Sequence, residues 1–176
     1  MQQSDLAPAT NRAPTEEERT AMAALRMSSP AFGHDDPLPA RFTADGDDVS
    51  PPLTWSGVPE GTKELVIICD DPDADEGVFT HWMVYGLAPE TAELAEGVPD
   101  EAVIDEPVAL LQGLNEYGDI GYRGPEPDED AGPHRLFFRL YALDAELDLS
   151  PGATRPELRR ATKGHVLDST ELVGIV

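Results

Sequence analysis

The sequence predicts a mainly β protein, built as a sandwich of two packed sheets with a few short helices at its periphery. Short apolar runs alternate with clusters of Pro, Gly and Asp along most of the chain. The 15 Gly and 17 Pro among 176 residues suit many short strands joined by turns better than a helical bundle. A hydrophobic content of 40% is enough for a core, and the length suits one domain.

The chain divides into a polar N-terminal segment and a folded domain. Residues 1–20 contain few apolar side chains, and we expect them to form a tail. Thr15 followed by Glu18 can form a capping box that opens a short helix over residues 16–24. We therefore expect a tail over residues 1–20, helical in part, and one domain over residues 21–176.

Four strands and one helix are indicated within the domain. The apolar run at residues 65–69 is typical of a strand covered on both faces, and residues 78–87, 136–143 and 171–176 predict three more strands. Thr154 can cap a helix with Pro156 in its first turn, and Gly164 can end it.

The charge balance restricts the classes of partner. Thirty-five Asp and Glu against 12 Lys and Arg give a net charge of −23, and the lysines are Lys63 and Lys163. Nucleic acids need a basic patch, so we do not expect one as the main partner. The composition resembles that of proteins from salt-loving organisms, in which concentrated salt screens the repulsion between carboxylates. The alternative is an ordinary acidic protein kept soluble by its net charge.

The single cysteine and the hydropathy pattern restrict the compartment. Cys69 excludes an intrachain disulfide and a cysteine-based zinc cluster, and its apolar neighbours favour a buried inert thiol over a reactive one. Nothing approaches the roughly 18 apolar residues of a membrane span, and the N-terminus lacks the pattern of a secretory signal. We expect a cytoplasmic protein.

Three segments concentrate polar groups beside apolar strands. These are the acidic turn at residues 70–75, the imidazole and indole of His81 and Trp82 within a strand, and the Gly/Pro-rich loop that leads to His134 and Arg135. Each segment also has a structural explanation, as a solvated charge cluster, a core histidine or turn chemistry. Neighbouring strand residues point to opposite faces, so one of His134 and Arg135 would enter a pocket while the other could pair with a carboxylate.

Taken together, the motifs resemble those of the phosphatidylethanolamine-binding protein family, in its bacterial and archaeal branch of Raf-kinase-inhibitor-like proteins. The resemblance covers roughly residues 25–176, and the ordered set is more specific than any single motif. Its motifs are Ser28-Ser29-Pro30-Ala31-Phe32, Asp48-Val49-Ser50-Pro51-Pro52-Leu53-Thr54-Trp55, Asp71-Pro72-Asp73-Ala74, His81-Trp82, Asn115-Glu116-Tyr117-Gly118, Gly121-Tyr122-Arg123-Gly124-Pro125, His134-Arg135 and Lys163-Gly164-His165-Val166-Leu167.

The resemblance implies a Greek-key β-sandwich with a small anion-binding pocket at one end. In the family such a pocket takes phosphate, sulfate, acetate or a phospholipid headgroup. The positions that match its lining are Asp71, Asp73, His81, Gly124, Pro125 and His134. The positions that match supporting residues are Trp55, Trp82 and Tyr122, together with Leu136, where the family usually has an aromatic residue.

Three functions remain open at this stage. The first is a regulatory or scavenging protein that binds small anions or lipid headgroups without a cofactor. The second is a hydrolase in which Asp71, His81 and His134 hold a metal or act directly. The sequence offers no further metal ligand at motif spacing and no serine in a nucleophile elbow. We therefore expect no enzyme and no bound metal. The third is a protein-interaction module of the kinase-inhibitor type, whose partner the sequence does not name. Pairing into homodimers is a further expectation from the resemblance.

The acidity gives a first testable prediction. Because salt screens repulsion among the carboxylates, the melting temperature of the protein should rise as KCl is raised from about 0.1 to about 2 M. Thermal unfolding followed by circular dichroism measures it. A flat or falling melting temperature would contradict the salt-adapted interpretation.

Overall fold

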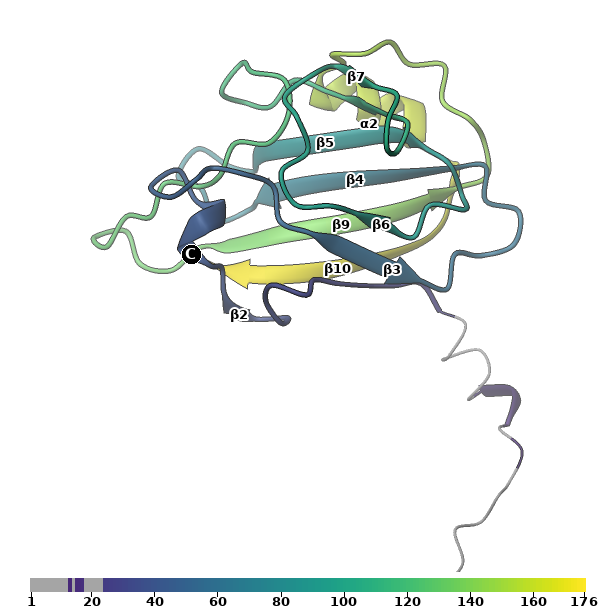
Figure 1. The fold of residues 1–176 in the computed structure, drawn as a ribbon, viewed down its shortest axis with the longest axis horizontal. Coiled ribbons are helices and arrows are strands. Elements are labelled where there is room, and N and C mark those ends of the chain that lie inside the picture. The colour runs from purple at the N-terminus through teal and green to yellow at the C-terminus, as the bar shows by residue number, and fades with distance from the viewer. Residues whose placement is uncertain (1–12, 14, 18–23) are drawn as a thin grey trace, which may run out of the picture.

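The molecule is a β-sandwich of a large and a small sheet, with one helix on the outside of the large sheet (Figure 1). The computed structural model describes residue 13, residues 15–17 and residues 24–176. Most of the predicted N-terminal tail and of its helix lies outside these residues. Glu16 and Glu17, which belong to that helix, are helical.

Seven strands form the large sheet, in the order β2-β10-β9-β4-β5-β8-β7. All its neighbouring strands run antiparallel except β2 and β10, which pair in parallel. In sequence order the strands are β2 (Asp36–Pro37), β4 (Glu64–Asp71), β5 (Phe79–Leu87), β7 (Val103–Ile104), β8 (Leu110–Gln112), β9 (Arg135–Leu143) and β10 (Val166–Ile175).

The small sheet covers one face of the large sheet. It consists of β1 (Arg26–Ser28), β3 (Leu53–Ser56) and β6 (Glu93–Leu94), in the order β1-β3-β6. The main core lies between the two sheets and includes Leu53 and Trp55 from β3 with Ile67, Trp82 and Phe138 from the large sheet. A short 3-10 helix, η1 (Ala40–Phe42), adds Phe42 to this core.

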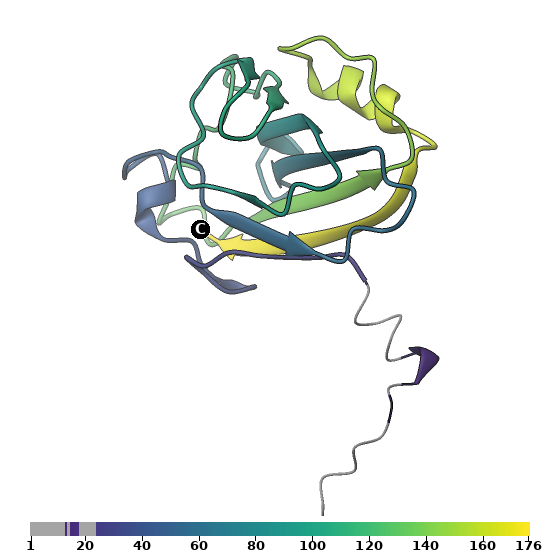
Figure 2. The ribbon, with the colours of Figure 1, turned by 45° about the vertical axis from the view of Figure 1, so that its right-hand side comes forward.

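Helix α2 (Arg155–Thr162) covers the other face of the large sheet, as Figure 2 shows from a second side. Its buried Leu158 packs with Val66, Ile68 and Met83 in a second core. Thr154 caps the helix by accepting a hydrogen bond from the Glu157 N–H, while the Glu157 carboxylate accepts one from the Thr154 N–H.

The predicted fold class is confirmed, and so are the four strands and the capped helix, although with different bounds. The strand predicted at residues 65–69 is β4, which extends through Asp70 and Asp71. Asp70 and Asp71 are both buried. Since both belong to the strand, the first two residues of the predicted acidic turn at 70–75 are strand residues. The strand predicted at residues 171–176 begins at Val166 and ends at Ile175. Cys69 is buried and free, as expected.

In the described part of the chain, no helix has the length and apolarity that a membrane crossing requires.

Candidate functional site

The antiparallel order of the sheet brings three distant segments to one of its ends. The last residue of β4, Asp71, pairs with the first residue of β5, Phe79. Strand β9 also runs antiparallel to β4, so its first residues lie beside the end of β4. Just before β9, the backbone N–H and C=O of His134 exchange two hydrogen bonds of 2.8 Å with Val176, beyond the end of β10.

A cavity of about 510 Å³ opens at this end of the sandwich. Its lining includes three acidic residues of one loop, Glu126, Asp128 and Glu129. Its lining residues are Asp71, Ala74, Asp75, Phe79, His81, Tyr117, Pro125, Glu126, Pro127, Asp128, Glu129, Ala131, Gly132, His134 and Val176.

A β-bulge turns His81 toward this cavity. Cys69 pairs with Trp82, but the next residue of β4, Asp70, pairs with Thr80, so His81 is the extra residue of β5. Without the bulge, strict alternation would place His81 on the face opposite to Trp82. Bulges re-aim side chains in this way next to functional sites. His81 is 3% exposed and lines the cavity together with Phe79.

Contacts on both sides hold the His81 ring. Its Nδ1 lies 2.8 Å from the carbonyl oxygen of Arg123. The ring centroids of Phe79 and Tyr117 lie 5.0 and 5.9 Å from the imidazole centroid, and the two aromatic rings meet edge to face at 4.8 Å. Burial lowers the pKa of His81 from its ordinary value of 6.5, although the Arg123 carbonyl and nearby carboxylates oppose this shift.

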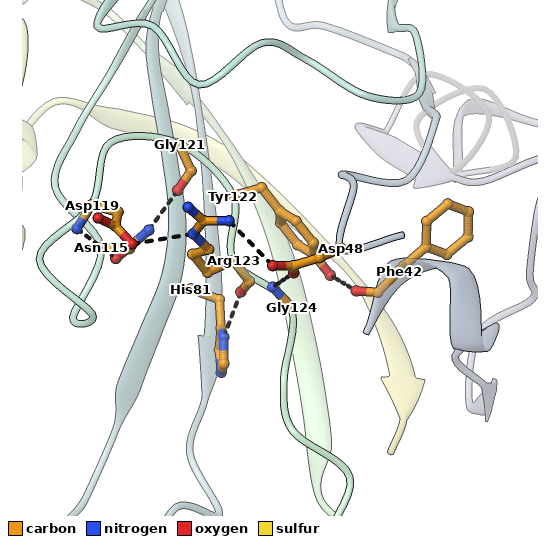
Figure 3. Close-up of polar contacts among 9 residues, drawn as sticks. All are labelled: Phe42, Asp48, His81, Asn115, Asp119, Gly121, Tyr122, Arg123 and Gly124. Carbon is orange, nitrogen blue, oxygen red and sulfur yellow. Dashed lines mark hydrogen bonds and ion pairs between the residues drawn. The ribbon is translucent and has the colours of Figure 1, made fainter. Parts of the chain in front are cut away.

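The segment that supplies the Arg123 carbonyl is itself fixed by the loop around Asp48 (Figure 3). The Arg123 N–H donates to the His81 carbonyl at 3.1 Å. Asp48 accepts from the Gly124 N–H at 2.6 Å and pairs with the Arg123 guanidinium at 3.3 Å. The Tyr122 hydroxyl donates to the Phe42 carbonyl at 2.6 Å. Arg123 therefore cannot withdraw its carbonyl from His81 without breaking several bonds.

A glycine is required where this segment meets the Asp48 loop. A Cβ atom on Gly124 would lie 2.3 Å from the Phe42 carbonyl oxygen and 2.9 Å from Thr43 Cα. Ala44 adds a backbone bond of 3.0 Å to the Pro125 carbonyl. The close approach of the two backbones explains the Gly-Pro pair of the motif without assigning the glycine a ligand contact.

Asn115 organises the turn that carries Tyr117. It is 3% exposed, and its Nδ2 donates to the Gly121 carbonyl at 2.9 Å. Its Oδ1 accepts from the backbone N–H of Tyr117 at 3.0 Å. The same oxygen accepts from the backbone N–H of Asp119 at 3.2 Å (Figure 3). The turn is thereby fixed to the segment that bonds His81.

His134 is bonded to Asp71. The distance from His134 Nδ1 to Asp71 Oδ2 is 2.7 Å, and the side chains are 27% and 8% exposed. This hydrogen bond raises the pKa of His134 above 6.5, with smaller contributions in the same direction from the charges of Asp71, Asp73 and Asp75. The cavity thus contains one imidazole that is favoured in its neutral form and one that is favoured in its charged form.

Alternation along β4 keeps a second acidic residue away from the cavity. Asp70 points to the opposite face of the sheet, where it accepts a hydrogen bond of 2.7 Å from the Thr80 hydroxyl and pairs with Arg155 of α2 at 2.9 Å. The Thr80 N–H, in turn, donates to the Glu116 carboxylate. These bonds fix Thr80, the residue next to the bulge.

The structure separates the predicted lining residues into two groups. Asp71, His81, Pro125 and His134 line the same cavity. Asp73 and Gly124 do not. Asp73 forms a bidentate pair with Arg135 at 2.9 Å, which lowers the pKa of Asp73 to about 2. His134 and Arg135 thus diverge as expected, one into the cavity and the other onto a carboxylate.

The predicted supporting residues belong to the core behind the cavity. Trp82 packs edge to face on Tyr122 at 5.7 Å and donates its indole N–H to Gln112 at 2.7 Å. Trp55 lies in the small sheet and donates to the Thr91 carbonyl. Leu136 is 1% exposed in the core between the sheets and does not line the cavity. An aromatic hydroxyl at this position would therefore have to be accommodated inside that core.

Sequence reasoning assigned no role to two of the residues that line the cavity, Phe79 and Tyr117. Phe79 and Tyr117 stack around His81, and Asp75 and Glu126 add charge at the opening. Phe79 stands two residues before His81, and strand alternation alone would have placed both side chains on one face. Tyr117 is 45% exposed, which is unusual for a large side chain and is explained by its position at the opening.

The metal-dependent alternative concerns Asp71, His81 and His134. In the structure, Asp71 and His134 bond each other directly, and Nδ1 of His81 is bonded to a carbonyl. Among residue 13, residues 15–17 and residues 24–176, no three His, Cys, Asp or Glu side chains are arranged as a metal-binding group.

Comparison with known proteins gives consistent matches. The family model for phosphatidylethanolamine-binding protein matches residues 28–176. Over 151 residues, which are 86% of this chain, it is 46% identical to a UPF0098 protein of Pyrococcus horikoshii, covering 75% of that protein. A UPF0098 protein of Methanothermobacter thermautotrophicus shows the same identity over 86% of this chain and 97% of its own length.

Two crystal structures share the fold. One is a phosphatidylethanolamine-binding protein homologue from Chlamydia trachomatis, with a TM-score of 0.78 and 37% identity over 88% of this chain and 97% of that chain. The other is YbcL of E. coli, described as a member of the mammalian PEBP family, with a TM-score of 0.79 and 25% identity over 86% of this chain and 96% of its own.

The two imidazoles should titrate on opposite sides of pH 6.5. We expect NMR to give a pKa above 6.5 for His134 and below 6.5 for His81. Asp71→Asn should lower the pKa of His134 towards 6.5, whereas Asp75→Asn, which removes a smaller contribution, should lower it less. Equal effects of the two variants would contradict the dominant role of the Asp71 bond.

The signs of these shifts also determine how folding stability depends on pH. The His134–Asp71 bond contributes fully below pH 6.5 and loses its contribution as the pH rises through the raised pKa of His134. His81 acts in the opposite sense, because its contribution is present above pH 6.5 and is lost as the pH falls through its lowered pKa.

Proposed function

The chain belongs to the phosphatidylethanolamine-binding protein family, and on this premise we propose that its cavity binds a small oxyanion. Phosphate, acetate and the phosphate of a lipid headgroup share the chemistry concerned. The observation that carries the proposal is the bond of 2.7 Å between Asp71 and His134, in a cavity that His81 also lines.

The Asp71 bond gives His134 the properties of an anion donor. A carboxylate can only accept, so Nδ1 of His134 carries a proton, and protonation of the ring adds a second N–H at Nε2. Because Asp71 raises the pKa of the ring, this second donor is present at a higher pH than in an ordinary histidine. A charge-assisted bond to an oxyanion is about twice as strong as a neutral one.

The apolar part of the lining suits a ligand held in one orientation. Phe79, Tyr117 and Pro125 form a wall beside the imidazoles, and Val176 lies at the end of β10. Pockets of this kind combine apolar walls with a few polar groups that fix orientation. Regulation or scavenging by a reversibly bound anion needs no chemistry beyond this.

The carboxylates of the lining oppose the proposed ligand. Asp71, Asp75, Glu126, Asp128 and Glu129 line the cavity, and among the described lining residues none is Lys or Arg. The protein carries a net charge of −23, so its overall field also repels anions. Binding should therefore depend on screening of these charges by salt.

The protonation of His134 should control affinity. We expect phosphate to bind about five- to tenfold more tightly at pH 5.5 than at pH 8, because a charge-assisted bond adds about 1 kcal/mol that is lost as the pH rises through the raised pKa of His134. Isothermal titration calorimetry measures the affinity. His134→Ala should reduce this pH dependence, because it removes the contribution of the imidazole.

His165→Ala is the matched control, since it removes an imidazole that lies 2.8 Å from Asp144 and does not line the cavity. Phosphate affinity that is the same in wild type, His134→Ala and His165→Ala would reject the proposed site.

Salt should strengthen binding, which is opposite to its effect on anion sites built from basic residues. Raising KCl from about 0.05 to about 0.5 M should increase phosphate affinity about two- to tenfold by screening the carboxylates at the opening. The triple variant Glu126→Gln, Asp128→Asn and Glu129→Gln should bind more tightly in dilute buffer and depend less on salt.

The control for this experiment neutralises three exposed carboxylates that do not line the cavity, Glu60, Glu93 and Glu101. If both triple variants change the salt dependence equally, the effect comes from net charge and the opening has no special role.

A further inference from the structure

The tautomer of His81 follows from its bond to a backbone carbonyl. The Arg123 oxygen, 2.8 Å from Nδ1, can only accept a hydrogen bond, so the proton lies on Nδ1. In the neutral ring, Nε2 then carries a lone pair and no proton. Figure 3 shows this second nitrogen on the side of the ring away from Arg123. No group in the described part of the chain forms a hydrogen bond with Nε2.

The neutral form of His81 is supported by its surroundings. Asp70 and Asp71 of β4 and Glu116 of the neighbouring turn are the carboxylates that favour a charged ring. Asp70 is paired with Arg155, and Glu116 accepts the Thr80 N–H. Burial outweighs these charges and lowers the pKa of His81.

The free nitrogens of the two imidazoles therefore differ. Nε2 of neutral His81 can only accept a hydrogen bond, whereas Nε2 of protonated His134 can only donate one. Three carboxylates favour the protonation of His134: Asp71, whose Oδ2 lies 2.7 Å from His134 Nδ1, together with Asp73 and Asp75. A ligand that bonds both nitrogens must present one donor and one acceptor.

Resting on the proposed function, we infer that the cavity selects an oxyanion that carries an ionisable proton, a phosphate monoester or inorganic phosphate, over a phosphodiester. The P–OH group of the singly protonated ligand donates to Nε2 of His81, and a phosphoryl oxygen accepts from His134. The second pKa of a phosphate monoester is about 6, so this form is accessible near neutral pH.

A phosphodiester lacks the required donor. Its unesterified oxygens carry no proton at neutral pH, so one of them would face the lone pair of His81 across the cavity. A polar atom left unpaired in this way costs about 1–3 kcal/mol, which corresponds to about five- to 150-fold in affinity. The five carboxylates of the lining also favour the monoanion of a monoester over its dianion.

Calorimetry with methyl phosphate and dimethyl phosphate tests the inference. At pH 5.5, where most methyl phosphate is the monoanion, we expect it to bind at least about fourfold more tightly than dimethyl phosphate. Titrations in two buffers of different ionisation enthalpy give the number of protons taken up. At pH 7, methyl phosphate should take up about one proton more than dimethyl phosphate, because most of it is a dianion in solution at that pH. Proton uptake by His134 is common to both ligands and cancels in the difference.

The outcomes separate the inference from the function on which it rests. Equal affinities, or equal proton uptake, would overturn the inference and leave anion binding intact. Failure of both ligands to bind would overturn the proposed function and the inference with it.

Two further measurements keep the inference testable without relying on one ligand pair. Nitrogen-15 NMR of the free protein at pH 7 should show His81 as the Nδ1–H tautomer, and an Nε2–H tautomer would overturn the inference. His81→Gln presents an amide that can donate or accept, so it should reduce the preference for methyl phosphate to less than about twofold. A full fourfold preference at pH 5.5 in a folded His81→Gln variant would also overturn it.

Discussion

The hydrogen bond between Asp71 and His134 is the interaction on which the rest of the site depends. It joins residues that are 63 positions apart in the sequence, because the end of β4 and the beginning of β9 meet at one end of the sheet. The bond fixes the orientation of the His134 ring and raises its pKa. It also occupies one oxygen of Asp71, a carboxylate that would otherwise repel an anion inside the cavity.

The second constraint is the bulge that carries His81. It lets Trp82 remain in the core while the preceding residue turns to the cavity, and it leaves Thr80 on the opposite face with Asp70 and Arg155. The Arg123 carbonyl then fixes which nitrogen of His81 is protonated. One end of the sandwich thus holds one imidazole whose pKa is raised by its bonded carboxylate and another whose pKa is lowered by burial.

The sequence predicted the elements with the strongest local signals. The apolar run of β4 and the capped helix α2 needed no tertiary information, and the ordered motifs indicated which side chains converge. The bulge left no trace in the pattern, so strict alternation would have placed His81 and Trp82 on opposite faces. Asp73 was assigned to the cavity because its position matches the lining of the family's pocket, but Arg135 lies close enough to pair with it. Such pairing depends on strand register, which hydrophobic periodicity alone did not determine.

A crystal structure of the protein grown with phosphate tests the central claim most directly. The account predicts a phosphate ion between the rings, with one oxygen within hydrogen-bond distance of Nε2 of His81 and another within reach of Nε2 of His134, while the Asp71–His134 bond is retained. An ion bound elsewhere with this cavity holding only water, or a His134 ring turned away from Asp71, would contradict it.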